Sequence, residues 1–257
     1  MIIDTHAHYD DEQFDEDRES LLAKMKNAGI GIIVNAGSTI SSWEKIRKLT
    51  KEYPFIYGAV GVHPDEAGTL NEEQMARMSV FLDEEKIVAL GEIGLDYYWD
   101  KESRDLQKKW FIRQLDLARE KNMPVIIHSR EAAADTMEIM KRHAAGMKAV
   151  IHYYSYSAEM AKEYVKMGYY IGVGGVVTFK NAKKLKETVQ EIPLSSIVLE
   201  TDCPYLAPVP YRGKRNCSLY LSYVAEEIAK LKGISAEEVV RQTEINSRDL
   251  YNLQRAE

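Results

Sequence analysis

Eight short runs of aliphatic and β-branched residues recur along the chain, and no other feature limits the possible folds as strongly. Their starts lie 20 to 37 residues apart. Runs that are apolar throughout are typical of strands buried on both faces of a parallel sheet. We expect the strands at 2–3, 30–34, 56–62, 87–93, 124–127, 149–151, 169–173 and 197–199.

The segments between these runs show helical spacing, most clearly at 20–28, 105–122, 158–168 and 235–253. Parallel strands need a crossover connection, which is usually a helix. Eight such units in 257 residues predict an α/β protein with a TIM-type (β/α)₈ barrel. An open doubly wound sheet is the alternative, but it usually has fewer strands. No Pro-, Gly- or Ser-rich linker interrupts the chain, so we expect a single domain over 1–257.

Composition narrows the function and the compartment. The chain has 34 Lys+Arg against 40 Asp+Glu, a net charge of −6, which excludes a protein that coats nucleic acid through bulk positive charge. A local basic patch on an enzyme stays possible. Two cysteines make no disulfide framework, no signal peptide precedes the first strand, and the longest mostly apolar run spans only 167–179. We therefore expect a soluble cytoplasmic protein.

Metal-ligating residue types gather where the predicted strands end. Five of the six histidines lie there, together with two acidic residues. In a TIM barrel the carboxyl ends of the strands carry the active site. The residues in question are His6 and His8 after the first strand, His63 after the third, Glu92 at the end of the fourth, His128 at the fifth, His152 at the sixth and Asp202 after the eighth.

This set is too large for one metal ion. Four imidazoles and two carboxylates exceed what a single tetrahedral ion with an open position uses. We assign one ion to His6, His8 and Asp202, a second to His128 and His152, and a bridge between them to Glu92. Two such ions activate water for hydrolysis, and Asp202 would accept its proton. Mg, Mn or Zn are all compatible with these ligands.

Six sequence motifs together resemble the TatD family of metal-dependent deoxyribonucleases, within the wider amidohydrolase-like group. They are Ile-Asp-Thr-His-Ala-His at 3–8, Gly-Val-His-Pro at 61–64, Gly-Glu-Ile-Gly-Leu-Asp-Tyr at 91–97, Ile-His-Ser-Arg at 127–130, Leu-Glu-Thr-Asp-Cys-Pro-Tyr-Leu at 199–206 and Arg-Gly-Lys-Arg-Asn at 212–216. The resemblance implies a TIM-like barrel, two divalent ions held as assigned above, and 3′-to-5′ cleavage of DNA. Some members of the family act on other esters, including D-aminoacyl-tRNA.

The chain departs from the family pattern in two places. Tyr-Tyr-Ser-Tyr-Ser at 153–157 replaces a Cys-Phe-Ser-Gly type of run, and Cys217-Ser218 replaces Glu-Pro. Neither departure affects a metal position, so the substrate preference is what they put in question.

Several residues have both a functional and a structural interpretation. His63 would donate to a phosphate or leaving group, or cap the loop before Pro64. Arg130 would clamp a phosphate, or pair with Glu131 or Asp135. The loop cations Arg212, Lys214 and Arg215 would follow a DNA backbone, as would a weaker lysine group at 180–186.

The tyrosines at 153, 154 and 156 would stack on a base, although we expect two of them to pack between sheet and helix. Cys203 lacks a free histidine partner and is not expected to be a nucleophile.

The sequence thus predicts a dinuclear hydrolase that binds DNA, either single-stranded or at frayed 3′ ends, without an obligate protein partner. A small-molecule amidohydrolase or esterase is an alternative, as is a non-catalytic nucleic-acid-binding barrel. The basic loop 212–215 favours a polyanion over the former, and the complete ligand set argues against the latter.

Overall fold

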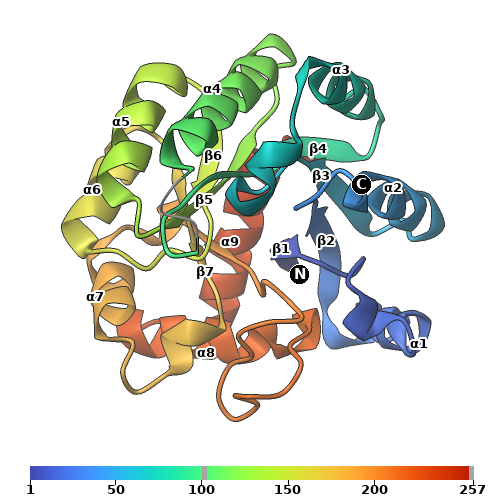
Figure 1. Cartoon of the computed structure of the whole chain (residues 1–257). Coiled ribbons are helices and arrows are strands. Elements are labelled where there is room, and N and C mark those ends of the chain that lie inside the picture. The colour runs from blue at the N-terminus through green and yellow to red at the C-terminus, as the bar shows by residue number, and fades with distance from the viewer. Residues whose placement is uncertain (100–102, 255–257) are drawn as a thin grey trace.

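A ring of eight parallel strands surrounded by helices forms the molecule, as a computed structural model of residues 1–99 and 103–254 shows (Figure 1). The strands pair in chain order: β1 (Ile2–Ala7), β2 (Ile30–Ala36), β3 (Ile56–Val60), β4 (Ile87–Asp96), β5 (Val125–Arg130), β6 (Ala149–Ile151), β7 (Tyr170–Val173) and β8 (Ile197–Leu199). The helices are α1 (Arg18–Leu22), α2 (Ser42–Glu52), α3 (Glu72–Phe81), α4 (Arg104–Glu120), α5 (Ala133–His143), α6 (Ala158–Lys166), α7 (Lys183–Glu191), α8 (Leu221–Lys232) and α9 (Ala236–Leu250).

The first and last strands meet, so the sheet is nearly closed into a barrel. Ala7 forms a parallel bridge with Cys203, and the backbone N–H of His8 donates to the Cys203 carbonyl oxygen at 2.9 Å. The Thr5 hydroxyl also donates to the Leu199 carbonyl oxygen at 3.0 Å. The predicted TIM-type barrel is therefore confirmed, and the open-sheet alternative is wrong.

Two apolar layers hold the barrel together. One fills the space between the strands and the surrounding helices. The other fills the barrel interior with mostly small side chains, which alternate along the strands with residues of the outer layer. Its strand members are Val34, Ala36, Ala59, Ala89, Ile126, Val150 and Val198.

Helix α9 closes one end of this interior. It passes behind the ring of strands in Figure 1, and Leu250 and Tyr251 at its carboxyl end pack against the interior side chains. The Tyr251 hydroxyl donates to the Thr5 carbonyl oxygen at 2.8 Å. Because α9 covers this end of the barrel, the polar residues at the opposite ends of the strands face the open end.

Some element boundaries differ from the predictions. Strand β4 continues to Asp96, so Glu92 lies within the strand and not at its end. The continuation depends on Gly94, which has a φ of 147° and sits so close to β5 that a Cβ there would meet the His128 carbonyl oxygen at 1.9 Å. The expected helix at 20–28 is also broken: α1 ends at Leu22 and a short 3-10 turn follows.

None of the helices within residues 1–99 and 103–254 is long and apolar enough to cross a membrane.

Candidate metal centre

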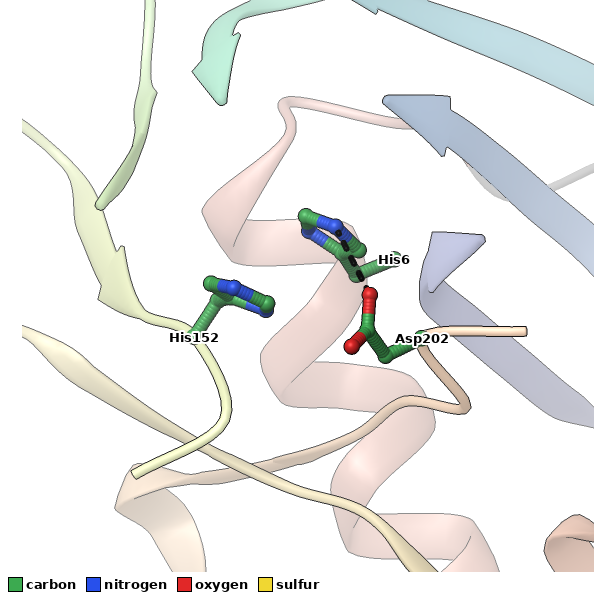
Figure 2. A group of neighbouring side chains, drawn as sticks. All are labelled: His6, His152 and Asp202. Atoms are coloured by element: carbon green, nitrogen blue, oxygen red, sulfur yellow. Dashed lines mark ion pairs between the residues drawn. The ribbon is translucent and has the colours of Figure 1, made fainter. Parts of the chain in front are cut away.

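Four donor atoms converge at the barrel mouth, two from the end of β1, one from within β4 and one from the segment after β8. His6 Nε2 lies 3.0 Å from His8 Nε2, 3.4 Å from Glu92 Oε2 and 3.6 Å from Asp202 Oδ1. His8 Nε2 lies 3.3 Å from the same Asp202 oxygen. Figure 2 shows the Asp202 carboxylate directed at the His6 ring, which stacks on His152 with 4.0 Å between ring centroids.

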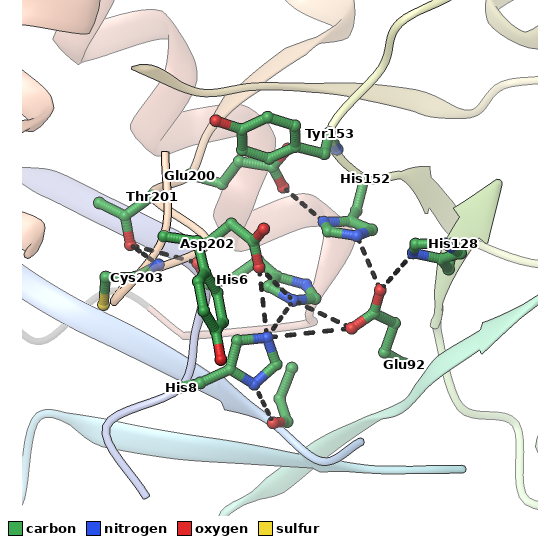
Figure 3. A network of polar contacts seen from close by, with 12 residues as sticks. His6, His8, Glu92, His128, His152, Tyr153, Glu200, Thr201, Asp202 and Cys203 are labelled. Atoms are coloured by element: carbon green, nitrogen blue, oxygen red, sulfur yellow. Dashed lines mark hydrogen bonds and ion pairs between the residues drawn. The ribbon is translucent and has the colours of Figure 1, made fainter. Parts of the chain in front are cut away.

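The other oxygen of Glu92 faces a second group of histidines. Glu92 Oε1 lies 2.7 Å from His128 Nδ1, 2.8 Å from His152 Nε2 and 3.9 Å from His63 Nε2. Figure 3 shows Glu92 between the two groups, with one carboxylate oxygen turned to each. The structure therefore brings together all six residues that the sequence assigned to a metal centre, and it adds His63 at the edge.

Hydrogen bonds fix which nitrogen His8 and His128 present to the cluster. A carbonyl oxygen only accepts, so His8 Nδ1–H donates to the Ala36 carbonyl oxygen at 2.9 Å and leaves Nε2 to the cluster. His128 Nε2 lies 3.0 Å from Asp96 Oδ2, which leaves Nδ1 facing Glu92. Such outer carboxylate and carbonyl partners are typical of metal-binding histidines.

Burial and charge move the pKa values of these groups in opposite directions. Burial and the neighbouring His152 lower the pKa of His6 to about 4. Burial also acts to lower the pKa of His8, but Asp202 and Glu92 outweigh it and raise that pKa to about 9. Burial would raise the pKa of Glu92, yet the surrounding histidines hold it well below its usual value.

The donor set fits divalent metal ions. Several groups of three side chains have ligand atoms within 4.8 Å of one another, among them His6, His8 and Glu92, and also His63, Glu92 and His128. Their mixture of imidazole and carboxylate suits Zn, Mn and related ions. Each carboxylate is ionised and surrounded by imidazole nitrogens, so bound cations would neutralise charge that is otherwise buried at the barrel mouth.

Buried polar groups of the barrel interior, around Asp4, hold the segment that carries Asp202. The Asp4 carboxylate accepts hydrogen bonds from the Thr201 hydroxyl at 2.7 Å and the Ser218 hydroxyl at 2.6 Å. The Asp202 backbone N–H donates to the His6 carbonyl oxygen at 2.9 Å. Asp202 has a φ of 56° and Tyr153 a φ of 47°, a conformation that is costly for residues other than glycine. Strain of this kind is concentrated at functional sites.

The donor atoms lie at the bottom of an open cavity of about 770 Å³. Its lining includes Trp99, Arg130, Tyr205 and His63 beside the candidate ligands. His63 matches its structural interpretation, because its Nδ1 accepts the Asp65 N–H at 3.2 Å and caps the 3-10 helix Pro64–Thr69. The same bond leaves Nε2–H of the neutral ring directed at the cavity. Burial and His128 lower the pKa of His63 to about 3, so the ring stays neutral.

The three cations of the basic loop contact other side chains of the protein. Arg215 holds the Asp17 carboxylate with both terminal nitrogens, at 2.8 and 2.6 Å, and so fastens the loop to the segment before α1. The Arg212 guanidinium lies 4.4 Å from the centre of the Phe179 ring, and Lys214 Nζ lies 5.9 Å from that of Tyr211. None of these three cations is among the described residues that line the cavity. Their contact with a DNA backbone stays a prediction.

The other side chains with two interpretations are also placed. Asp135 pairs with Lys108 and Tyr97 at 2.7 Å each, while Arg130 lies over the Tyr98 ring. Among the described residues Arg130 therefore forms an ion pair with neither Asp135 nor Glu131, the two partners of its structural interpretation.

Two of the three tyrosines pack as expected. Tyr154 is buried, and the Tyr156 hydroxyl bonds to Ser129 at 2.9 Å. Cys203 is also buried, and burial raises the pKa of its thiol well above the usual value.

One member of the lysine group at 180–186 is paired within the protein, since Lys186 forms an ion pair with Glu227.

Sequence reasoning missed two acidic residues of the site. Asp96 follows Glu92 by four positions in one strand, and alternation places both on the same face, a signal that was present. Glu200 lies in the motif before Asp202. Its Oε2 lies 3.9 Å from His152 Nδ1, Oε1 accepts the Tyr153 backbone N–H, and burial raises its pKa to about 8.

Comparisons with known proteins agree with this architecture. Residues 3–252 match the family model described as TatD related DNase. The chain is 44% identical to the metal-dependent hydrolase YabD of Bacillus subtilis over 98% of this chain and 100% of that protein. It is 35% identical to the metal-dependent hydrolase YcfH of Escherichia coli over 98% and 96% of the two chains.

Solved structures show the same relationship. The crystal structure of YjjV, a TatD homologue from Escherichia coli, superposes with a TM-score of 0.93 at 31% identity and covers 98% of both chains. An organophosphorus hydrolase variant shares the fold alone, with a TM-score of 0.63 at 15% identity. The chain therefore belongs to the TatD-related DNase family of metal-dependent hydrolases.

Proposed function

We propose that this protein is a dinuclear hydrolase that cleaves DNA phosphodiester bonds and removes nucleotides from 3′ ends. The observation that carries the proposal is the Glu92 carboxylate, which offers one oxygen to each of two groups of histidines (Figure 3). A bridging carboxylate of this kind is suited to a pair of metal ions. The DNase description of the family supports the choice of substrate.

The proposed ligands divide as the geometry does. His6, His8 and Asp202 would hold one Mg, Mn or Zn ion, His128 and His152 a second, and Glu92 both. When bound, such a pair of ions lowers the pKa of a water and neutralises charge on a phosphoryl group. Attack of a water on phosphorus would form the new bond to oxygen as the bond to the leaving sugar oxygen breaks, and the leaving oxygen would take up a proton.

The chain's own groups would handle the protons. Asp202 is ionised, because His8, His152 and His6 outweigh the effect of burial and lower its pKa, so its carboxylate can accept a proton from the attacking water. The neutral His63 ring directs Nε2–H into the cavity and would donate a hydrogen bond to the phosphate or the leaving oxygen. Glu92, between the two groups of histidines, would keep their positions fixed relative to each other.

The cavity volume is within the range of about 300–1,000 Å³ that small-molecule sites have, which suits a terminal nucleotide better than a duplex. Single-stranded DNA or a frayed 3′ end is therefore the proposed partner, with no obligate protein partner. Both cysteines are free and buried, in keeping with a proposed site of action in the reducing cytoplasm.

One observation favours a second candidate. Asp10, Asp11, Glu12 and Asp65 also line the cavity, and this acidic rim would repel a long polyanion. A small ester or amide, or the ester end of an aminoacyl-tRNA, is the alternative substrate class.

A cleavage assay on end-labelled single-stranded DNA separates the two. Metal-free protein is resupplied with Mg, Mn or Zn and compared with Asp202→Asn and with Asp116→Asn, the same change at an exposed position on α4. We expect laddering from the 3′ end that needs metal, disappears in Asp202→Asn and persists in Asp116→Asn. Metal binding without any DNA cleavage would contradict the proposal and favour the small-ester candidate.

A further inference from the structure

Two aromatic rings stand exposed at the rim of the cavity, on the loop that follows β4. Trp99 is 67% exposed and Tyr98 is 45% exposed, whereas Trp43 and Trp110 are buried. The two rings meet edge to face with 4.7 Å between centroids. Tyr and Trp rings are enriched where a protein surface binds a partner, so these two neighbouring rings are candidates for ligand contact.

A cation lies against the same rings. The Arg130 guanidinium carbon is 3.9 Å from the centre of the Tyr98 ring and 5.5 Å from that of Trp99. Arg130 is two residues after His128 on β5, so both side chains extend from the same face of the strand. Arg130 and Trp99 line the same cavity as Glu92 and His128.

Asp96 links the loop that carries the two rings to the candidate metal ligand His128. Asp96 Oδ1 accepts the backbone N–H groups of Tyr98 at 2.8 Å and Trp99 at 3.2 Å, while its other oxygen bonds to His128. One carboxylate thus fixes both a candidate metal ligand and the loop that carries the rings.

The charges around the rim bear on where a phosphate would bind. The acidic residues Asp10, Asp11 and Glu12 line one part of the rim, and the Tyr205 hydroxyl donates to Asp11 there at 3.2 Å. Lys45, the other cation of the described lining, donates to the Asp10 carbonyl oxygen at 3.3 Å. Asp65 also lines the cavity, with a carboxylate oxygen within 4.8 Å of one of Asp96, so repulsion is not confined to that part of the rim; Arg130 is the cation beside the rings that attracts a phosphate.

We propose that Tyr98, Trp99 and Arg130 form a subsite for the nucleotide next to the scissile bond, in which an unpaired base stacks on Trp99 and its phosphate contacts Arg130. The inference rests on the proposed nuclease function and names the groups that select single-stranded substrate. Stacking on aromatic residues tolerates any base, so the subsite would discriminate by strandedness and not by sequence.

Kinetics on two substrates test the subsite. Trp99→Ala should raise KM for a single-stranded oligonucleotide by about 5-fold to 150-fold, the range that loss of one base–aromatic stack produces. Its kcat should be unchanged, as should KM for bis(p-nitrophenyl) phosphate, which is too short to span from the scissile bond to the rim. Trp99→Phe should restore most of the loss, and Val80→Ala, an equally exposed apolar position on α3, serves as the control.

A binding measurement gives a readout without turnover. Since Trp43 and Trp110 are buried, fluorescence quenching by an oligonucleotide reports mainly on Trp99. In the Asp202→Asn background we expect quenching by an intact single strand and at least 5-fold weaker binding when the residue next to the 3′ end is abasic. Equal affinity for the intact and the abasic oligonucleotide, or an unchanged KM in Trp99→Ala, would overturn the proposed subsite. Absence of cleavage by the unaltered protein would instead refute the proposed function.

Discussion

Asp96→Asn should weaken metal binding at the His128 side of the centre although Asp96 is not assigned as a ligand. Asp96 Oδ2 lies 3.0 Å from His128 Nε2, and Oδ1 accepts two backbone N–H groups of the following loop. An asparagine that keeps its oxygen on the loop must turn its NH₂ group towards His128. That ring nitrogen would then have to accept, and the ring proton would move to Nδ1, where it faces Glu92 and blocks the lone pair needed for an ion.

Loss of an outer partner of this kind typically lowers metal affinity by about 10-fold to 100-fold, or about 1.4–2.7 kcal/mol. Burial acts to raise the pKa of Asp96, but His128 and the backbone N–H groups hold it below its usual value, so the change also removes a full negative charge. The affinity for the proposed ion at His128 and His152 should fall, and the affinity for the ion at His6, His8 and Asp202 should not.

Competition with a chromophoric chelator measures the two dissociation constants on metal-free protein. Asp135→Asn is the matched control, because that carboxylate makes an equivalent pair of bonds, to Tyr97 and Lys108, away from the candidate ligands. Unchanged constants for both ions in Asp96→Asn would refute the argument that Asp96 sets the His128 tautomer. Equal weakening in both variants would show a general loss of stability instead.

Other perturbations have equally direct outcomes. Gly94→Ala should lower the melting temperature and abolish metal binding, because its Cβ would collide with the β5 backbone; Gly68→Ala, with nothing within 4 Å, should do neither. Asn246→Ala should lower the free energy of unfolding by about 2–4 kcal/mol in a urea titration, since the buried side-chain amide donates to two backbone carbonyl oxygens, at 2.8 and 2.7 Å. Unchanged stability would mean that water replaces the amide. Chelation should lower the melting temperature, and readdition of metal at about 100 times its dissociation constant should restore about 2.7 kcal/mol. Arg215→Ala should leave KM for DNA unaltered, because the side chain is paired with Asp17; a several-fold rise would return the loop to the substrate path.

The ligand set could be predicted because it depends on local rules. Parallel strands end at one edge of a barrel, and His6, His128 and His152 follow from that edge alone. The position of Glu92 between the two groups of histidines was also within reach, since a surplus of candidate ligands calls for a shared one. The exact strand length was not, because β4 continues through Gly94 only where β5 approaches it closely.

The substrate contacts could not be predicted in the same way. Arg215 finds its carboxylate 198 residues away in the chain, and a local motif carries no record of such a partner. Arg130 had an acidic neighbour within reach at Asp135, which Lys108 and Tyr97 occupy instead. The geometry of rings and cations at a rim depends on loops from several strands, and a linear pattern does not encode it.

The plug formed by α9 also sets when the barrel can form during synthesis. The bond between the Tyr251 hydroxyl and the Thr5 carbonyl oxygen joins residues 246 positions apart. On a translating ribosome β1 emerges well before its partner β8 and the plug, which lie far along the chain. Until then the barrel interior is open to water and β1 lacks one neighbour. Closure of the ring, and with it the assembly of His6 and His8 opposite Asp202, therefore has to wait until β8 and α9 have emerged.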